Sequence, residues 1–203
     1  MKKNTCKLAV IAALTLVFAL FIENMSDFYF KCSEIRENTI RLHVIANSDS
    51  AADQELKLIV RDAIIDNFSA ADSALDKSQA EDIIKGNLSE IIAEAQEVVR
   101  SNGYEYTVGA ELCTMYFDTK DYGSFTMPAG EYDALRIIIG SGSGRNWWCV
   151  MFPPLCLPAS QENVNINEYF GDSSEILVKK PKYKVKFAIV ELYEKIVQAF
   201  KSL

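Results

Sequence analysis

Histidine is nearly absent from this sequence, cysteine is sparse, and an excess of positive charge is lacking. Histidine occurs once, as His43, and no Cys/His spacing is typical of a zinc site. The formal net charge is −7, with no basic patch and no Walker-type phosphate loop. This balance disfavours nucleic acids and anionic lipid surfaces as partners, and we expect neither a metal nor another cofactor.

The N-terminus has the pattern of a targeting segment. A short basic start precedes residues 8–22, which contain no charge. An apolar stretch of about 7–15 residues after a basic start is typical of a secretory signal, whereas a spanning helix needs about 20 residues. No clean A-x-A cleavage site follows, so a cleaved signal and a short membrane anchor both stay open. We predict that residues 1–26 direct export and that residues 27–203 form one exported domain.

Five cysteines are present, and Cys6 lies in the targeting segment. Outside the cytosol, nearby cysteines tend to pair, although their connectivity cannot be determined from sequence. Cys149 and Cys156 flank a Phe-Pro-Pro stretch. They are the first pair to test as a possible disulfide.

Hydrophobic periodicity predicts a single α+β domain with the order β-α-α-β-β-β-α and a mostly antiparallel sheet packed by helices. The predicted strands are residues 40–46, 104–116, 132–139 and 147–152, and the predicted helices are residues 51–68, 78–101 and 184–200. Residues 23–38 are predicted to be a polar connector, and residues 157–180 an irregular segment.

Glycines and apolar spacing predict further details of this domain. The glycine-rich residues 140–144 indicate a hairpin turn between the last two strands, because a phosphate-binding loop would lead directly into a helix. Asn102-Gly103 indicates the end of the preceding helix. In the last helix we expect these residues to face inward: Ile189, Leu192, Tyr193, Ile196 and Phe200.

Polar side chains gather along the helix that follows the first strand. Gln54, Lys57 and Arg61 continue from Ser50 at helical spacing and form one stripe, apart from the apolar face. The stripe fits a contact surface. It also fits a solvated helix face with local ion pairs such as Asp53 to Lys57, and spacing alone favours this second interpretation.

A cysteine hydrolase site can also be drawn from the sequence, with Cys149 as nucleophile, His43 as base and Asn47 to orient the base. Cys149 lies within a predicted strand, without the helix N-terminus that activates reactive thiols. A disulfide would also remove the nucleophile. We therefore favour a packed, hydrogen-bonded His43 over a catalytic one.

Trp147 and Trp148 are adjacent, so on a strand their side chains face opposite sides of the sheet. One can fill the core. The other is either an exposed anchor for a partner or buried under the proline segment, and the sequence leaves both outcomes open.

Two long segments resemble the stage II sporulation protein R family. They are RLHVIANSDSAADQELKLIVRD at residues 41–62 and GEYDALRIIIGSGSGRNWWCVMFPPLC at residues 130–156. Their order, their spacing and the export signal also fit the family, so the resemblance covers essentially the whole exported domain. The closing KVKFAIVELYEK fits more loosely, and no functional residue is carried over from it.

The resemblance implies an exported signalling protein of endospore-forming bacteria, with no active site of its own. Such a protein is made in the forespore and enters the space between the two membranes. There it activates a membrane-embedded aspartic protease of the mother cell, which processes the precursor of sigma factor E. Membrane contact is expected only through residues 8–22, if they are retained. The predicted partner-binding residues are Arg41, His43, Asn47, Asp49, Gln54, Lys57, Arg61, Asn146 and Trp147.

Two other functions stay open beside this one. The first is an extracytoplasmic cysteine hydrolase that uses Cys149 and His43, which requires a free Cys149 thiol. The second is a cell-wall-binding module that uses the two tryptophans and the following Pro153-Pro154 segment. This function requires that the protein is retained on isolated peptidoglycan.

Overall fold

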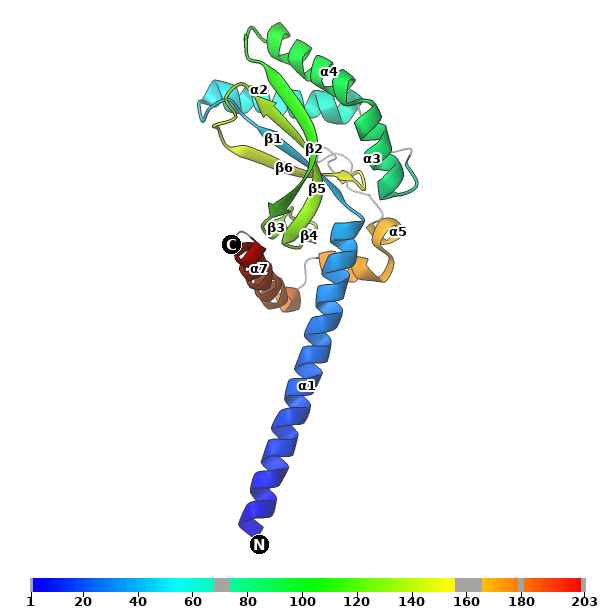
Figure 1. Ribbon diagram of the computed structural model, residues 1–203, viewed down its shortest axis with the longest axis vertical. Helices are drawn as coiled ribbons and strands as arrows, with labels where there is room; N and C mark the ends of the chain where they lie inside the picture. Colours follow the sequence, from blue (N-terminus) through cyan, green and yellow to red (C-terminus); the bar gives the residue numbers. More distant parts are fainter. Residues whose placement is uncertain (1, 68–73, 156–165, 179–180, 202–203) are drawn as a thin grey trace.

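The computed structural model describes residues 2–67, 74–155, 166–178 and 181–201. A long N-terminal helix leads into a mixed α+β domain in which helices lie on both faces of a sheet (Figure 1). The helices are α1 (Lys2–Glu37), α2 (Ala51–Asn67), α3 (Lys77–Gly86), α4 (Leu88–Ser101), α5 (Ile166–Phe170), the 3-10 turn η2 (Gly171–Ser173), α6 (Ser174–Leu177) and α7 (Pro181–Lys201). The strands are β1 (Ile40–Ile45), β2 (Val108–Phe117), β3 (Lys120–Asp121), β4 (Thr126–Met127), β5 (Gly130–Ile139) and β6 (Asn146–Phe152).

Strand β1 lies inside the four-stranded sheet, whose order is β2-β5-β1-β6. It runs parallel to β5 and antiparallel to β6, and β2 pairs with β5 antiparallel. All six residues of β1 are buried. The sheet is mostly antiparallel, as predicted. The predicted hairpin of β5 with β6 is wrong, because β1 lies between them.

The first core layer lies between one face of the sheet and the helices α2, α3 and α4. Leu42 and Val44 of β1 pack in this layer with Leu56 of α2, and all three are at most 1% exposed. The apolar residues of α2 recur every three or four positions and so share one helix face. The single helix predicted over residues 78–101 is two helices, because Asn87 separates α3 from α4.

The second core layer lies on the opposite face and includes the C-terminal part of α1. Phe28, Cys32 and Ile35 of α1 are at most 1% exposed and share this layer with Phe187 of α7. Their spacing of four and three residues places them on one helix face. The polar connector predicted over residues 23–38 is therefore wrong, because most of this segment is the packed end of α1.

The N-terminal part of α1 extends away from both core layers (Figure 1). Its side chains from Val10 to Ile22 are exposed, and the helix is long and apolar enough to cross a membrane. This is compatible with the predicted signal or anchor. The helix continues without a break through residue 26, the predicted boundary of the targeting segment.

Part of the segment predicted to be irregular is helical. Residues 166–178 include α5, η2 and α6, which close the second core layer with Phe170 and Leu177. The earlier residues of that segment lie outside the described part of the chain. Phe125, at the short β3–β4 ribbon, forms a bridge with Val178 next to these helices.

Helix α7 buries the face opposite to the predicted one. Tyr183, Phe187 and Val190 are at most 5% exposed. The helix is apolar on two faces, and the face with Tyr183 and Phe187 packs on α1, where each ring contacts Phe28. The residues predicted to face inward are exposed instead: Ile189, Leu192, Tyr193, Ile196 and Phe200.

Candidate functional site

The loop after β1 and the glycine-rich turn after β5 are bonded to each other. We call them the loop clamp, residues 46–50 and 140–145. The hydroxyls of Ser141 and Ser143 each donate to the Asn47 carbonyl oxygen at 2.7 Å. The Ser141 backbone N–H donates to Asn47 Oδ1 at 3.0 Å. The turn therefore binds Asn47 through both the backbone carbonyl oxygen and the side-chain oxygen of Asn47.

Two glycines allow the turn to approach the loop closely. A Cβ on Gly144 would lie 2.2 Å from the Ser48 carbonyl oxygen, and one on Gly140 would lie 2.4 Å from Asn47 Oδ1. Gly140 also has a φ of 57°, which favours a residue without a Cβ. Strands β5 and β6 are two strand spacings apart, about 10 Å, so the turn has to pass over the end of β1.

The polar stripe of α2 bonds to the turn. Lys57 is 4% exposed, and its Nζ donates to the Arg145 carbonyl oxygen at 3.0 Å and to Gln54 Oε1 at 2.6 Å. Gln54 Nε2 donates to the Ser48 carbonyl oxygen at 2.9 Å. Burial lowers the pKa of Lys57, and the Arg145 charge acts in the same direction. The structure thus places Gln54 and Lys57 in an internal network between loop, helix and turn.

Asp53 is the acidic centre of the loop clamp. Its carboxylate accepts hydrogen bonds from Ser48 Oγ and from Asn47 Nδ2. Its backbone N–H donates to Ser50 Oγ at 3.1 Å, which caps the start of α2. The hydrogen bond from Ser48 is the main cause that lowers the pKa of Asp53. The Asp53–Lys57 ion pair considered from the sequence is not formed, because Asp53 bonds to the loop and Lys57 to the turn.

The predicted binding residues that stay accessible lie at the rim of the clamp. Asp49 is exposed and accepts a hydrogen bond from the Arg145 backbone N–H at 2.7 Å. Asn146 is exposed and Trp147 is half-buried. The Arg61 guanidinium lies 4.3 Å from the Trp147 ring centroid. Together with Arg145, which is 72% exposed, these residues leave a contact surface narrower than the predicted one.

Arg41 and His43 lie inside the domain, so the structure does not support direct contact through either side chain. Arg41 is fully buried, and its guanidinium lies 4.4 Å from the Phe117 ring centroid and 5.0 Å from that of Tyr132. His43 is 3% exposed and stacks on Trp148 with ring centroids 3.8 Å apart. Burial lowers the pKa of His43 to about 4, so the imidazole is neutral in the folded protein at neutral pH.

Cys149 and His43 face opposite sides of the sheet. Cys149 pairs in register with Leu42, whereas His43 pairs with Trp148, and successive strand residues alternate between faces. Cys149 is also disulfide-bonded. The nucleophile–base pair of the hydrolase hypothesis is therefore not formed. Cys156 lies outside the described residues, so the predicted Cys149–Cys156 pairing stays a prediction.

Beside the loop clamp, a part of the sheet that we call the open sheet face lies beyond the described helices of the second core layer. Strand register places Glu111, Arg136, His43 and Trp148 in one row across it, and the His43 ring stacks on the Trp148 ring. Arg136 Nη1 pairs with a Glu111 carboxylate oxygen at 3.1 Å, and both side chains are at least one-third exposed. Sequence reasoning missed this pair. The available signal was Arg136, a charged residue between the apolar residues of β5.

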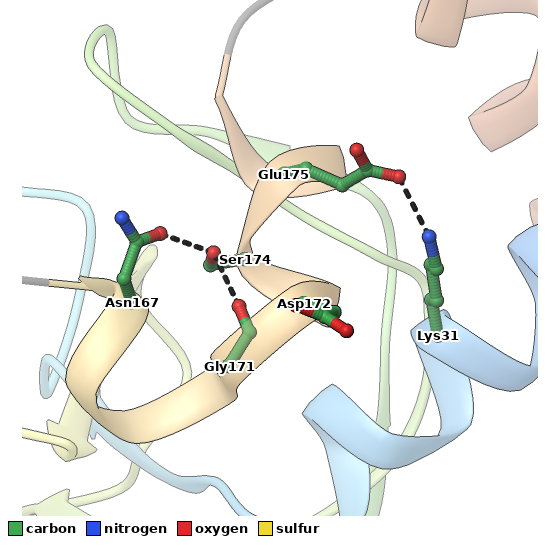
Figure 2. A pocket seen from close by; sticks show the side chains of 6 residues that line it. All are labelled: Lys31, Asn167, Gly171, Asp172, Ser174 and Glu175. Carbon is green, nitrogen blue, oxygen red and sulfur yellow. Dashed lines mark hydrogen bonds and ion pairs between the residues drawn. The ribbon is translucent and has the colours of Figure 1, made fainter.

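A polar hollow of about 650 Å³ lies between α1 and the α5–α6 segment (Figure 2). Lys31 Nζ contacts a Glu175 carboxylate oxygen at 2.6 Å across it. Ser174 Oγ donates to the Gly171 carbonyl oxygen at 2.6 Å and bonds to Asn167. The hollow has no imidazole or thiol in its lining. Among the described residues, no cluster of His, Cys, Asp and Glu could hold a metal ion.

The fold and the site define a class of protein: an α+β domain with a polar loop surface, carried on an apolar N-terminal helix. In the described part of the chain, the catalytic pair considered from the sequence is not assembled. The sheet, the loop clamp and the open sheet face all lie within residues 40–152.

The chain belongs to the stage II sporulation protein R family, whose model matches residues 36–162. A curated relative from Bacillus subtilis (strain 168), described as "Stage II sporulation protein R", is 41% identical over 123 residues. The match covers 60% of this chain and 55% of that relative, so it spans little more than half of the relative's length. No solved structure matches significantly. Family membership supports a role in sporulation.

Proposed function

We propose that this protein is an exported signal that activates a membrane-embedded aspartic protease of the mother cell during sporulation. The protease then processes the precursor of mother-cell sigma factor E. The observation that carries the proposal is the family match over residues 36–162, which contains the whole loop clamp and the whole open sheet face. The proposed location is the space between the forespore and mother-cell membranes.

The arrangement of the molecule supports this proposal. The apolar part of α1 extends from one end of the domain, and the turn between β5 and β6 lies at a remote end of the sheet (Figure 1). If α1 sits in the membrane from which the chain was exported, the loop clamp points away from that membrane. A receptor in the opposing membrane would therefore meet the clamp first.

The exposed side chains give this surface a mixed charge pattern. Asp49 and Arg145 are exposed at the rim of the loop clamp, and Arg136 is about one-third exposed on the open sheet face, which also carries the half-buried Trp148. Charges at the rim of an interface mainly set the association rate and the choice of partner. A half-buried tryptophan can supply the apolar anchor of such a contact.

The test is cleavage of the sigma-factor precursor in cells that produce the precursor and the protease, with and without this protein. We expect cleavage to require the protein. The double change Arg136→Glu and Arg145→Glu should lower cleavage about tenfold, because it reverses one charge on the open sheet face and one at the rim of the loop clamp. Arg100→Glu is the matched control, since Arg100 is exposed on α4, which packs on the other face of the sheet.

Three outcomes separate the alternatives. No dependence on a well-expressed, exported protein would contradict the proposed function. Dependence with equal cleavage by the double variant and the Arg100→Glu control would keep the function and exclude this surface. Loss of cleavage by His43→Phe in a folded protein would reopen a chemical role for the imidazole.

A further inference from the structure

Helix α7 exposes an apolar stripe that no described segment covers. The stripe residues are spaced by four, three, four and four positions, which places them on one helix face. The opposite face carries the buried residues Tyr183, Phe187 and Val190. The stripe consists of Val185, Ile189, Leu192, Ile196 and Phe200, which are 39% to 72% exposed.

This helix packs on α1 just after the apolar part of α1 ends. The rings of Phe28 and Phe187 have centroids 5.0 Å apart, and those of Tyr29 and Tyr193 are 5.4 Å apart. Phe28 lies six positions after Ile22, a rise of about 9 Å along the helix. A headgroup layer is about 5–8 Å thick on each side of a bilayer. If residues 8–22 occupy a bilayer, the contact of α7 with Phe28 therefore lies at the outer edge of the headgroup layer.

The charges near the start of this stripe are positive, whereas the net charge of the chain is negative. Residues 179–186 contain five lysines and no acidic residue. The two glutamates of α7 are turned toward the domain: Glu194 pairs with Arg36 at 3.1 Å, and Glu191 accepts from the Thr119 backbone N–H. An apolar helix face next to lysines, beside a membrane-length helix, is the pattern of an interfacial amphipathic helix.

We infer that α7 is a second membrane contact: its apolar stripe enters the interface of the bilayer that holds α1, and its N-terminal lysines contact anionic headgroups. Basic residues near a bilayer surface are attracted to anionic lipid. This extends membrane contact beyond residues 8–22 and over a helix outside the family match, which ends at residue 162. The inference depends on retention of α1 and is independent of the proposed protease activation.

The test places a photoreactive benzoylphenylalanine at position 192 or 196 of the full chain. The purified protein is reconstituted in vesicles of phosphatidylcholine and phosphatidylglycerol and irradiated. We expect lipid adducts from both positions, at about tenfold higher yield than from position 75. Leu75 is the matched control, because it is 86% exposed and adjoins α3, on the opposite face of the sheet.

Two further measurements separate lipid from other occupants. With the probe at position 200, the change Leu192→Glu should lower the lipid adduct yield about fivefold without changing the melting temperature, because Leu192 is exposed. In vesicles of phosphatidylcholine alone, the yield should also fall. Crosslinks between two copies of the chain, protein adducts that replace lipid adducts in sporulating cells, or yields equal to position 75 would each overturn the inference.

Discussion

At the scale of single residues, Gly144 sets how closely the turn approaches the loop after β1. Gly144→Ala places a Cβ 2.2 Å from the Ser48 carbonyl oxygen, so the backbone must shift. We expect a loss of about 1–3 kcal/mol in the free energy of unfolding, measured by urea titration of the detergent-solubilised chain. Gly109→Ala is the control, because a Cβ there has no atom within 4 Å. Equal stability of the two variants would contradict this account of the turn.

Arg41 is a buried cation whose guanidinium is surrounded by aromatic rings, and no ion pair joins it to a described carboxylate. Its Nε donates to the Cys149 carbonyl oxygen at 3.0 Å, and its Nη2 donates to Tyr122 Oη at 2.7 Å. Arg41→Lys loses the planar donor group and keeps the buried charge, so we expect a loss of about 3 kcal/mol. Arg41→Met removes the charge at similar volume, and we expect a smaller loss in the same urea titration. The reverse order would show that the charge itself stabilises the fold.

His43 makes stability depend on pH. Burial lowers its pKa in the folded protein to about 4 from an ordinary value of 6.5. Between these values the unfolded chain binds a proton that the folded chain does not, so stability falls as the pH decreases through this window. We expect His43 to contribute a loss on the order of 1–3 kcal/mol by pH 4. His43→Phe keeps a ring to stack on Trp148 and should flatten unfolding free energy against pH from 6.5 to 4. An unchanged slope would assign this pH dependence to other groups.

At the scale of elements, Arg36 and Glu194 join α1 to α7. They form a buried ion pair at 3.1 Å, with side chains 8% and 9% exposed. Glu194→Leu leaves Arg36 without its counter-charge, and we expect a loss of about 3–5 kcal/mol in urea unfolding. The double change Arg36→Met and Glu194→Leu should recover at least half of that loss, because no unpaired charge remains. Additive losses would show that the two residues do not act as a pair.

The sequence predicted most elements but not all of their neighbours. Alternation indicated β1 and β2, and helical spacing indicated α2, because these patterns follow from one apolar face. The insertion of β1 between β5 and β6 could not be predicted, since an alternating strand fits several positions in a sheet equally well. Helix α7 shows the same limit: it is apolar on two faces, and only its packing on Phe28 of α1 selects the buried one.

The structure brings several of the predicted contact residues together, and their role as a binding surface stays a prediction. Asn47 and Asp49 follow β1 and Asn146 begins β6 at the same end of the sheet, and Lys57 of α2 reaches this end through its hydrogen bond to the Arg145 carbonyl oxygen. Their bonding to the glycine-rich turn depends on the path of that turn over β1, from β5 to β6. No local sequence pattern predicts this path. The burial of Arg41 also depends on rings that lie far away in the sequence.

At the scale of the whole molecule, the two ends of the chain are joined through one core layer. α1 supplies Phe28 and α7 supplies Phe187 to the second core layer, and the sheet lies between this layer and helices α2 to α4. Removal of residues 1–26 would leave Phe28 in place. The domain can therefore keep this core whether or not residues 1–26 are cleaved.

The position of β1 also determines when the loop clamp can assemble. Ile40 pairs with Asp133 on one side and with Phe152 on the other. If the part of the chain that follows α1 is transported in sequence order, β1 emerges before both of its partner strands, and such distant pairings form late in folding. The loop clamp then assembles only after most of the chain has been transported. Under the proposed function, a chain arrested midway through transport would therefore carry no assembled loop clamp for its receptor.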